Sequence, residues 1–128
     1  MILTGHDLAS VVMAALNPVP LKTDPISIDI HIAKKLEIEP GGFDTAPARE
    51  EFDMPTDIAA LLTGRSIHMR RGINTPMGWI DPGKRGEVEL EFFNMSDEMQ
   101  TLDKHEAVAR LVFFQVGNTE GYDGRFQE

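Results

Sequence analysis

The chain has 128 residues, enough for one domain with its own core, and its 41% hydrophobic and 26% charged residues are typical of globular proteins. Its formal charge of -9 argues against a nucleic-acid partner, because an acidic surface repels a phosphate backbone. The absence of cysteine excludes disulfides, thiolate nucleophiles and cysteine-ligated zinc, and with no long apolar run or signal-peptide layout we expect a cytoplasmic protein that binds no membrane.

The first predicted element is a short helix near the N-terminus. Residues 4–7 (TGHD) have the pattern of a capping box, in which side chains satisfy the first free N–H groups of a helix. Apolar residues then recur at helical spacing until Pro18 and Pro20 end the pattern. These apolar positions are Leu8, Val11, Val12, Ala15 and Leu16.

A half-buried β-strand is predicted over residues 26–32, where four isoleucines alternate with polar residues. We expect residues 36–38 to continue this strand or to pair with it before the break at residues 40–42. Residues 43–53 are polar and end in an acidic run, so we interpret them as an unstructured, solvated segment. Residues 55–62 are compatible with either a helical turn or a strand.

The β pattern returns after residue 78. Residues 81–83 (DPG) predict a turn, and residues 87–92 predict a strand with its three glutamates on one face. Residues 107–116 form a second apolar strand, long enough to be central, before a glycine-containing tail that we expect to be exposed. One helix followed by many short strands predicts a mainly β barrel or sandwich, in one domain spanning residues 1–128.

The scarce cations gather at one place in the sequence. Arg65, Arg70 and Arg71 lie within seven residues, and Gly64 and Ser66 flank the first of them. Backbone N–H groups, guanidinium forks and a hydroxyl group together suit a phosphate. The same arginines are compatible with surface ion pairs to the surplus acids, so the pattern leaves both interpretations open.

Motifs for several other chemistries are missing from the sequence. The four histidines lack metal-ligand spacing, so we expect no metal site made by the protein. Hydrolase-elbow, P-loop and dinucleotide fingerprints are also absent. Asp81 has a structural interpretation as a turn residue, and nothing in the pattern singles out Glu91 from the other glutamates of its strand.

Three segments nevertheless follow one another in an order that is typical of a known family. Residues 24–30 read DPISIDI, residues 64–72 read GRSIHMRRG, and residues 79–92 read WIDPGKRGEVELEF. They are similar to the N-P-x-S-x-D-L, G-R-S-S-L-A-R-x-G and I-D-P-G-x-x-G…L-E-F blocks of the dCTP deaminase/dUTPase superfamily. The chain resembles the dCTP deaminase branch more than the dUTPase branch.

The resemblance implies a distorted, jelly-roll-like β barrel of the dUTPase-like (β-clip) type with a short N-terminal helix, assembled as a homotrimer with shared active sites. It implies zinc-independent deamination of dCTP to dUTP with release of ammonia. Glu91 would activate water, and Ser66 and Arg70 would hold the reaction centre together. We expect Glu91 to be partly buried beside these two residues, and Glu87 and Glu89 to lie nearer the turn, in water.

The resemblance also implies how the nucleotide is held. The pyrimidine deoxynucleoside triphosphate would be met by Arg65, Ser66, Asp81 and the C-terminal tail. Mg²⁺ would bind through the nucleotide phosphates rather than in a protein cage. The tail residues implied in binding are Tyr122, Arg125, Phe126 and Gln127.

Departures from the family pattern keep two alternative functions open. Ile67 and His68 stand in place of the family's second serine and the small apolar residues after it, and residues 41–54 and 74–78 are shorter than in the family. One alternative is a dUTP diphosphatase that gives dUMP and pyrophosphate, with Asp81 positioning the water. The other is a catalytically inactive, nucleotide-binding paralogue.

Overall fold

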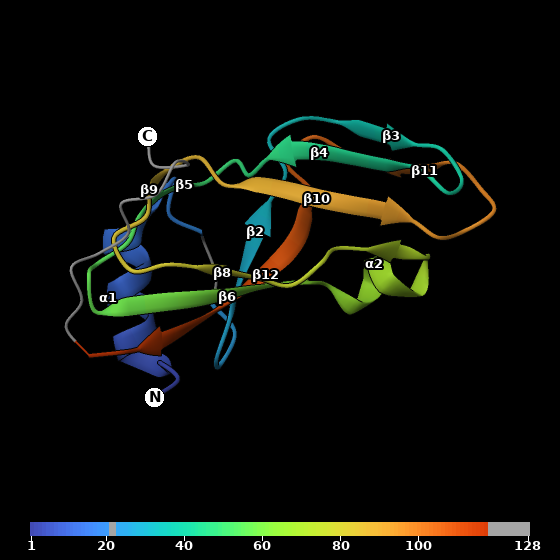
Figure 1. The fold of residues 1–128 in the computed structure, drawn as a ribbon. Helices are drawn as coiled ribbons and strands as arrows, with labels where there is room; N and C mark the ends of the chain where they lie inside the picture. Colours follow the sequence, from blue (N-terminus) through green and yellow to red (C-terminus); the bar gives the residue numbers. More distant parts are fainter. Residues whose placement is uncertain (21–22, 118–128) are drawn as a thin grey trace.

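The computed structural model describes residues 1–20 and 23–117 (Figure 1), within which the chain forms two helices and twelve strands. The helices are α1 (Gly5–Ala15) and α2 (Ser66–Arg70). The strands are β1 (Leu16–Asn17), β2 (Ile28–His31), β3 (Leu36–Ile38), β4 (Phe43–Pro47), β5 (Glu51–Asp53), β6 (Ile58–Gly64), β7 (Ile73–Asn74), β8 (Gly78–Ile80), β9 (Arg85–Gly86), β10 (Glu89–Asn94), β11 (Gln100–Leu102) and β12 (Ala107–Gln115).

The described strands form four antiparallel sheets and no closed barrel. The largest sheet has the order β2-β12-β6-β8, and the others are β4-β10-β7, β1-β5-β9 and β11-β3. Figure 1 shows β4 and β10 lying over one side of the largest sheet, with α1 and α2 at opposite ends of the molecule. This mainly β, jelly-roll-like arrangement with a short N-terminal helix confirms the predicted fold class. Neither described helix has the length and apolarity needed to cross a membrane.

The core forms where the alternating strands face one another. Ile28 and Ile30 of β2 and Leu111 and Phe113 of β12 are all fully buried. In β10 the buried and exposed residues alternate without exception, which confirms the predicted two-faced strand. The apolar run at residues 107–116 is likewise confirmed as a central strand, because β12 pairs with β2 on one side and β6 on the other.

The interpretation of residues 43–53 as unstructured is wrong. They form β4, which pairs along the length of β10, and β5, which pairs with both β1 and β9. Glu50 belongs to the acidic run but is fully buried, because its carboxylate accepts hydrogen bonds from the backbone N–H of His31 at 3.0 Å and from its ring Nδ1 at 2.6 Å. Long-range pairing therefore outweighs the polar local composition.

Smaller differences from the sequence predictions also have local causes. The side chain of Thr4 makes no capping hydrogen bond, so the predicted capping box is absent. Ile26 lies outside β2 and is 48% exposed. Residues 36–38 pair with β11 instead of with β2. Of the two alternatives for residues 55–62, a helical turn or a strand, the structure shows a strand, β6, which begins at Ile58.

Candidate functional site

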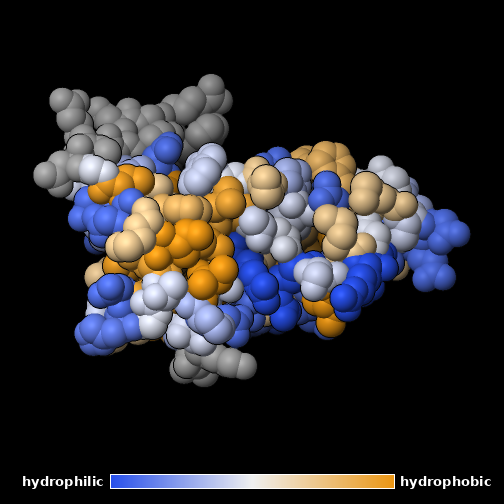
Figure 2. Space-filling view, turned by 90° about the horizontal axis from the view of Figure 1, so that it is seen from below, coloured by the Kyte–Doolittle hydropathy of each residue, from blue (hydrophilic) through white to orange (hydrophobic). Residues whose placement is uncertain are grey.

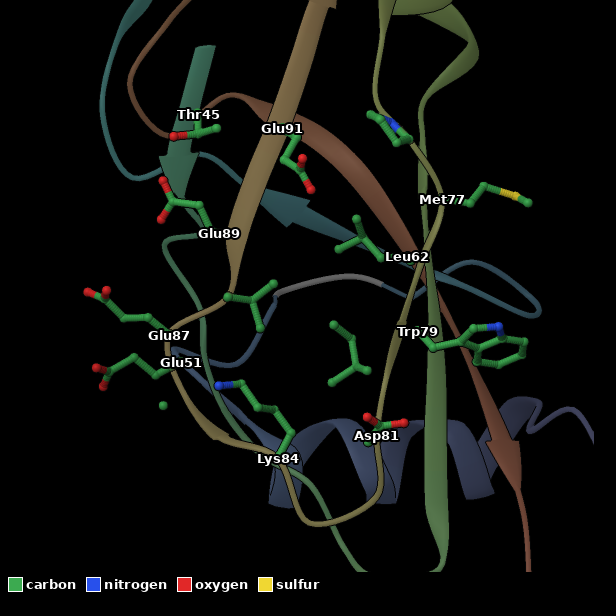
Figure 3. Close-up of a pocket in the computed structure, with 15 residues that line it drawn as sticks. Thr45, Glu51, Leu62, Met77, Trp79, Asp81, Lys84, Glu87, Glu89 and Glu91 are labelled. Atoms are coloured by element: carbon green, nitrogen blue, oxygen red, sulfur yellow. The ribbon is translucent and has the colours of Figure 1, made fainter. Parts of the chain in front are cut away.

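One pocket of the described residues is lined by several carboxylates and is called here the carboxylate pocket. It has a volume of about 1050 Å³ and lies between β10 and the segment that runs through β8 into the following turn (Figure 3). Its charged lining residues are Glu51, Asp81, Lys84, Glu87, Glu89 and Glu91. The five carboxylates and one ammonium of this lining favour a neutral or cationic group, such as a nucleobase.

Two carboxylates enter the pocket from opposite ends. Glu91 points from β10 toward the strand segment that carries Met77, and Asp81 lies at the far end, in the turn after β8 (Figure 3). The turn is held by the Lys84 N–H, which donates to the Asp81 carbonyl at 3.1 Å, and Gly83 has the positive φ of 82° that such a turn requires. The structure therefore brings Glu91 and Asp81 to one pocket.

Glu91 is exposed in the single chain, as Glu87 and Glu89 are. Its register partner on β4 is Thr45, which also lines the carboxylate pocket. The partial burial expected of Glu91 is therefore not provided by the described residues of its own chain. Glu87 lies apart from Glu91 in the pocket, because Glu87 directly follows β9 and Glu91 lies within β10 (Figure 3).

A second pocket, called here the arginine pocket, has a volume of about 670 Å³. Strand β6 ends at Gly64 and α2 begins at Ser66, so the chain turns sharply at this pocket. A Cβ atom on Gly64 would lie 3.2 Å from the Cβ of Thr75, which is why the close approach suits glycine. The lining residues are Thr63, Gly64, Arg65, Ser66, Met69, Arg70, Asn74, Thr75, Pro76 and Met77.

The three clustered arginines have different environments. Arg65 donates through Nη1 to the Ala107 carbonyl at 3.1 Å, and its Nε lies 3.6 Å from Asp29. Arg71 donates to the side chain of Gln100 and to the backbone of Thr101 and does not line the arginine pocket. Arg70 lines the pocket and makes no hydrogen bond or ion pair within residues 1–20 and 23–117. The ion-pair interpretation thus applies to Arg65, and Arg70 keeps its donors for a ligand.

The two pockets are neighbours, but they are not one site. They share the lining residues Pro76 and Met77 and no charged side chain. The structure therefore brings Arg65, Ser66 and Arg70 together, and it places Glu91 with Asp81 in the adjoining pocket. Tyr122, Arg125, Phe126 and Gln127 lie outside the described residues.

Sequence reasoning missed a buried polar pair next to the arginine pocket. His68 of α2 is 3% exposed, and its Nε2 lies 2.6 Å from Oε2 of Glu106. Burial raises the pKa of the Glu106 carboxyl, but the hydrogen bonds from His68 and the Asp103 N–H and the charges of His68 and Arg71 outweigh burial and hold its pKa below the ordinary 4.5. The signal in the sequence is a histidine among the apolar residues of a short helix.

Metal ligands do not cluster in the part of the chain that the structure describes. No group of three or more histidine, aspartate or glutamate side chains there could hold an ion. The carboxylates of Glu91 and Asp81 come from opposite ends of their pocket, which suits separate roles better than a shared ion (Figure 3). These residues fit a Mg²⁺ ion only if the ligand itself supplies most of the oxygens.

Comparison with known proteins shows the family and the fold of this chain. A family model described as dCTP deaminase-like matches residues 5–116, and the chain belongs to this family. A curated relative named "dCTP deaminase, dUMP-forming", from Nanoarchaeum equitans, is 39% identical over 85 residues. That match covers 65% of this chain and 43% of the relative, so the chain spans less than half the length of that protein.

Solved structures share the fold at low sequence identity. The 2'-deoxycytidine 5'-triphosphate deaminase of Agrobacterium tumefaciens superposes with a TM-score of 0.76 at 15% identity, covering 88% of this chain and 48% of that one. A mutant dUTPase from phage phi11 of S. aureus, whose structure reveals the coordination of a structural Mg(II) ion, superposes with a TM-score of 0.67 at 18% identity, covering 83% and 88%. The fold is therefore shared by deaminases and dUTPases.

The lowered pKa of Glu106 predicts a particular loss of stability in acid. Because the folded pKa lies below 4.5, the contact stabilises the fold above that pH, and its contribution is lost as the pH falls through the lowered folded value. Glu106→Gln should lower the free energy of unfolding at neutral pH, and the difference from the unmodified protein should shrink in acid. Urea unfolding at a series of pH values measures this difference.

The matched control is Glu98→Gln, since the carboxylate of Glu98 makes no contact with the described residues and its side chain is exposed. That variant should change the free energy of unfolding little at any pH. A Glu106→Gln effect that stays the same from neutral to acid pH would contradict the assigned role of the His68 contact.

Proposed function

We propose that this chain is the subunit of a homotrimeric, zinc-independent dCTP deaminase that releases ammonia and forms dUTP. The observation that supports this most is the division of the site residues between two pockets of one chain, the carboxylate pocket and the arginine pocket. A single chain offers a carboxylate for water at one pocket and cations for phosphates at the other. Two neighbouring subunits would each supply one half of a complete site.

The carboxylate pocket suits the base of the nucleotide and the attacking water. Glu91 takes a proton from water as the water oxygen forms a bond to C4 of cytosine, and it delivers that proton to the ring nitrogen. Glu91 then takes the remaining proton of the new C4 hydroxyl and passes it to the amino group as the C4–N bond breaks, so that one ammonia and one uracil ring result. One carboxylate thus carries every proton that the reaction moves.

The arginine pocket suits the triphosphate. Arg70 has its full set of donors for phosphate oxygens, and the Ser66 hydroxyl lies in the same pocket. Arg65 is held by Asp29 and the Ala107 carbonyl, so it meets phosphate with its remaining N–H groups. Mg²⁺, bound through the phosphate oxygens, would neutralise part of their charge. The nucleotide would also be bound by Tyr122, Arg125, Phe126 and Gln127, which lie outside the described residues.

A second candidate function is conversion of dCTP to dUMP, with release of both ammonia and pyrophosphate. It is favoured by the name of the Nanoarchaeum relative, which is dUMP-forming, and by the presence of Asp81 in the same pocket as Glu91. Asp81 would position a second water for attack on the phosphate chain. Hydrolysis of dUTP without deamination would use Asp81 but not Glu91.

An apolar face that the chain leaves uncovered supports the proposed trimer. The apolar residues of the segments 26–32, 88–92 and 111–116 could have formed such a face, but they are mostly buried within the chain itself. The uncovered surface is the outer face of the largest sheet, where strand register places Leu61, Trp79, Val112 and Phe114 together. Figure 2 shows this apolar patch over β6, β8 and β12.

Trp79→Glu should therefore dissociate the trimer without unfolding the chain. Trp79 is 61% exposed and packs on Phe114 with ring centroids 5.4 Å apart, so a charge there costs little in the monomer but much in a buried contact. Sedimentation equilibrium measures the mass of the variant. Met99→Glu is the control, because Met99 is 52% exposed but lies away from this face. An unmodified protein that sediments as a monomer at every concentration would contradict the shared site.

The reaction itself is tested by Glu91→Gln. The variant keeps the size of the side chain but cannot take a proton from water, so ammonia release should fall by about 10²–10⁴-fold while dCTP still binds. Ammonia and pyrophosphate are measured separately after incubation with dCTP and with dUTP. Pyrophosphate from dCTP would favour the dUMP-forming reaction.

The control for this assay is Glu89→Gln, on the same face of β10. It should change neither ammonia release nor dCTP binding. Full deaminase turnover in Glu91→Gln would make the proposed mechanism wrong. Unmodified protein that binds dCTP but releases neither product would be the inactive, nucleotide-binding paralogue.

A further inference from the structure

Helix α2 carries two residues of the proposed site, Ser66 and Arg70, but it is too short to be stable by itself. It has five residues, its N-cap residue Arg65 makes no side-chain capping hydrogen bond, and Ile67 and Met69 are 54% and 47% exposed. His68 is the one side chain that α2 buries. The position of α2 therefore depends on what His68 contacts.

The contact of His68 is a single carboxylate. Glu106 lies immediately before β12, and its Oε2 is 2.6 Å from Nε2 of His68. Its other oxygen accepts the N–H of Asp103 at 2.9 Å, and its backbone carbonyl accepts the N–H of Ile32 at 3.0 Å. These two hydrogen bonds, one to the side chain and one to the backbone of Glu106, fix its position. Glu106 can therefore hold His68, and with it α2, in place.

No other partner replaces this carboxylate. Nδ1 of His68 is buried and has no hydrogen-bond partner in the described residues. Loss of the Glu106 contact would leave the whole imidazole buried without a partner, which is unfavourable for a polar group. The chain avoids this unpartnered imidazole if α2 moves away and His68 becomes exposed to water.

The residue before α2 is attached at the same place. Arg65 donates to the carbonyl of Ala107, the neighbour of Glu106, at 3.1 Å. Residues 65 and 68 thus both bind the start of β12, one to a backbone oxygen and the other to a side-chain oxygen. Figure 1 shows α2 at the outer end of the molecule, away from α1.

We propose that the His68–Glu106 contact positions α2, and with it Ser66 and Arg70, for the triphosphate. The proposal rests on the nucleotide site proposed above. His68 and Glu106 are positioning residues, because neither lines the arginine pocket and neither is needed to touch the nucleotide. If the contact is broken, the measured affinity falls in proportion to the fraction of molecules in which α2 is seated.

A double-mutant cycle on nucleotide affinity tests this proposal. Glu106→Ala leaves the buried His68 without a partner, and His68→Leu removes the group that attaches α2 to Glu106. Each variant should weaken dCTP binding about tenfold. Calorimetry well below the unfolding temperature measures this affinity. The double variant His68→Leu/Glu106→Ala leaves no buried polar group without its partner and should regain most of the affinity. Leucine also occupies the position of His68 in the sequence block that this segment resembles.

A second readout does not depend on the nucleotide. Hydrogen exchange of the backbone amides of residues 66–72 should become faster in Glu106→Ala and return toward the unmodified rate in the double variant. Val12→Ala is the control, since it removes buried methyl groups from α1, at the end of the molecule opposite α2 (Figure 1). It should lower stability without changing exchange in α2 or dCTP affinity.

The outcomes separate the two proposals. Tenfold weaker binding in the single variants, recovered in the double variant and absent in Val12→Ala, supports the positioning role. Unchanged affinity and unchanged exchange in Glu106→Ala overturn it. If Glu106→Ala does not fold, Glu106→Gln carries the same test with a smaller expected loss. If unmodified protein binds no nucleotide, the proposed function fails, and exchange in residues 66–72 alone decides whether the contact anchors α2.

Discussion

The pairing of β12 with β2 on one side and β6 on the other is the constraint on which the rest of the structure depends. This pairing buries the isoleucines of β2 and the apolar residues of β12 in one core. It also decides where the chain can turn, because β6 ends at Gly64, opposite Ala109, and leads straight into α2. The start of β12 then holds Arg65 and His68, so the same strand that fills the core also places the cations.

Separation of opposite charges is the feature that makes the site usable. In a chain with a formal charge of -9, arginines near carboxylates form ion pairs, as Arg65 does with Asp29. Arg70 avoids this because the arginine pocket has no acidic lining residue. Glu91 lies in the neighbouring pocket, so neither group neutralises the other before the nucleotide binds. In the proposed trimer, a subunit contact would bring the two halves together into a complete site without pairing them inside one chain.

Local patterns predicted the elements whose periodicity matches their burial, and long-range contacts decided the rest. The alternation in residues 87–92 and the apolar run of residues 107–116 predicted β10 and β12, because each side chain's environment follows from its own strand. Residues 43–53 were misread, because Glu50 is buried by a partner 19 residues away, His31. Arg65 and Glu91, which the resemblance singled out, each line a pocket. The His68–Glu106 contact joins residues 38 apart, so nothing local to His68 indicates Glu106 as its partner.

The central claim is that one site takes Glu91 from one subunit and Arg70 from its neighbour, and subunit mixing tests it most directly. Glu91→Gln and Arg70→Ala should each be inactive alone. When the two variants are refolded together in equal amounts, half of the subunits keep Glu91 and half keep Arg70, so about a quarter of the sites should be intact. Ammonia release from dCTP near a quarter of the unmodified rate is the predicted result. A mixture no more active than its two parents would contradict the shared site.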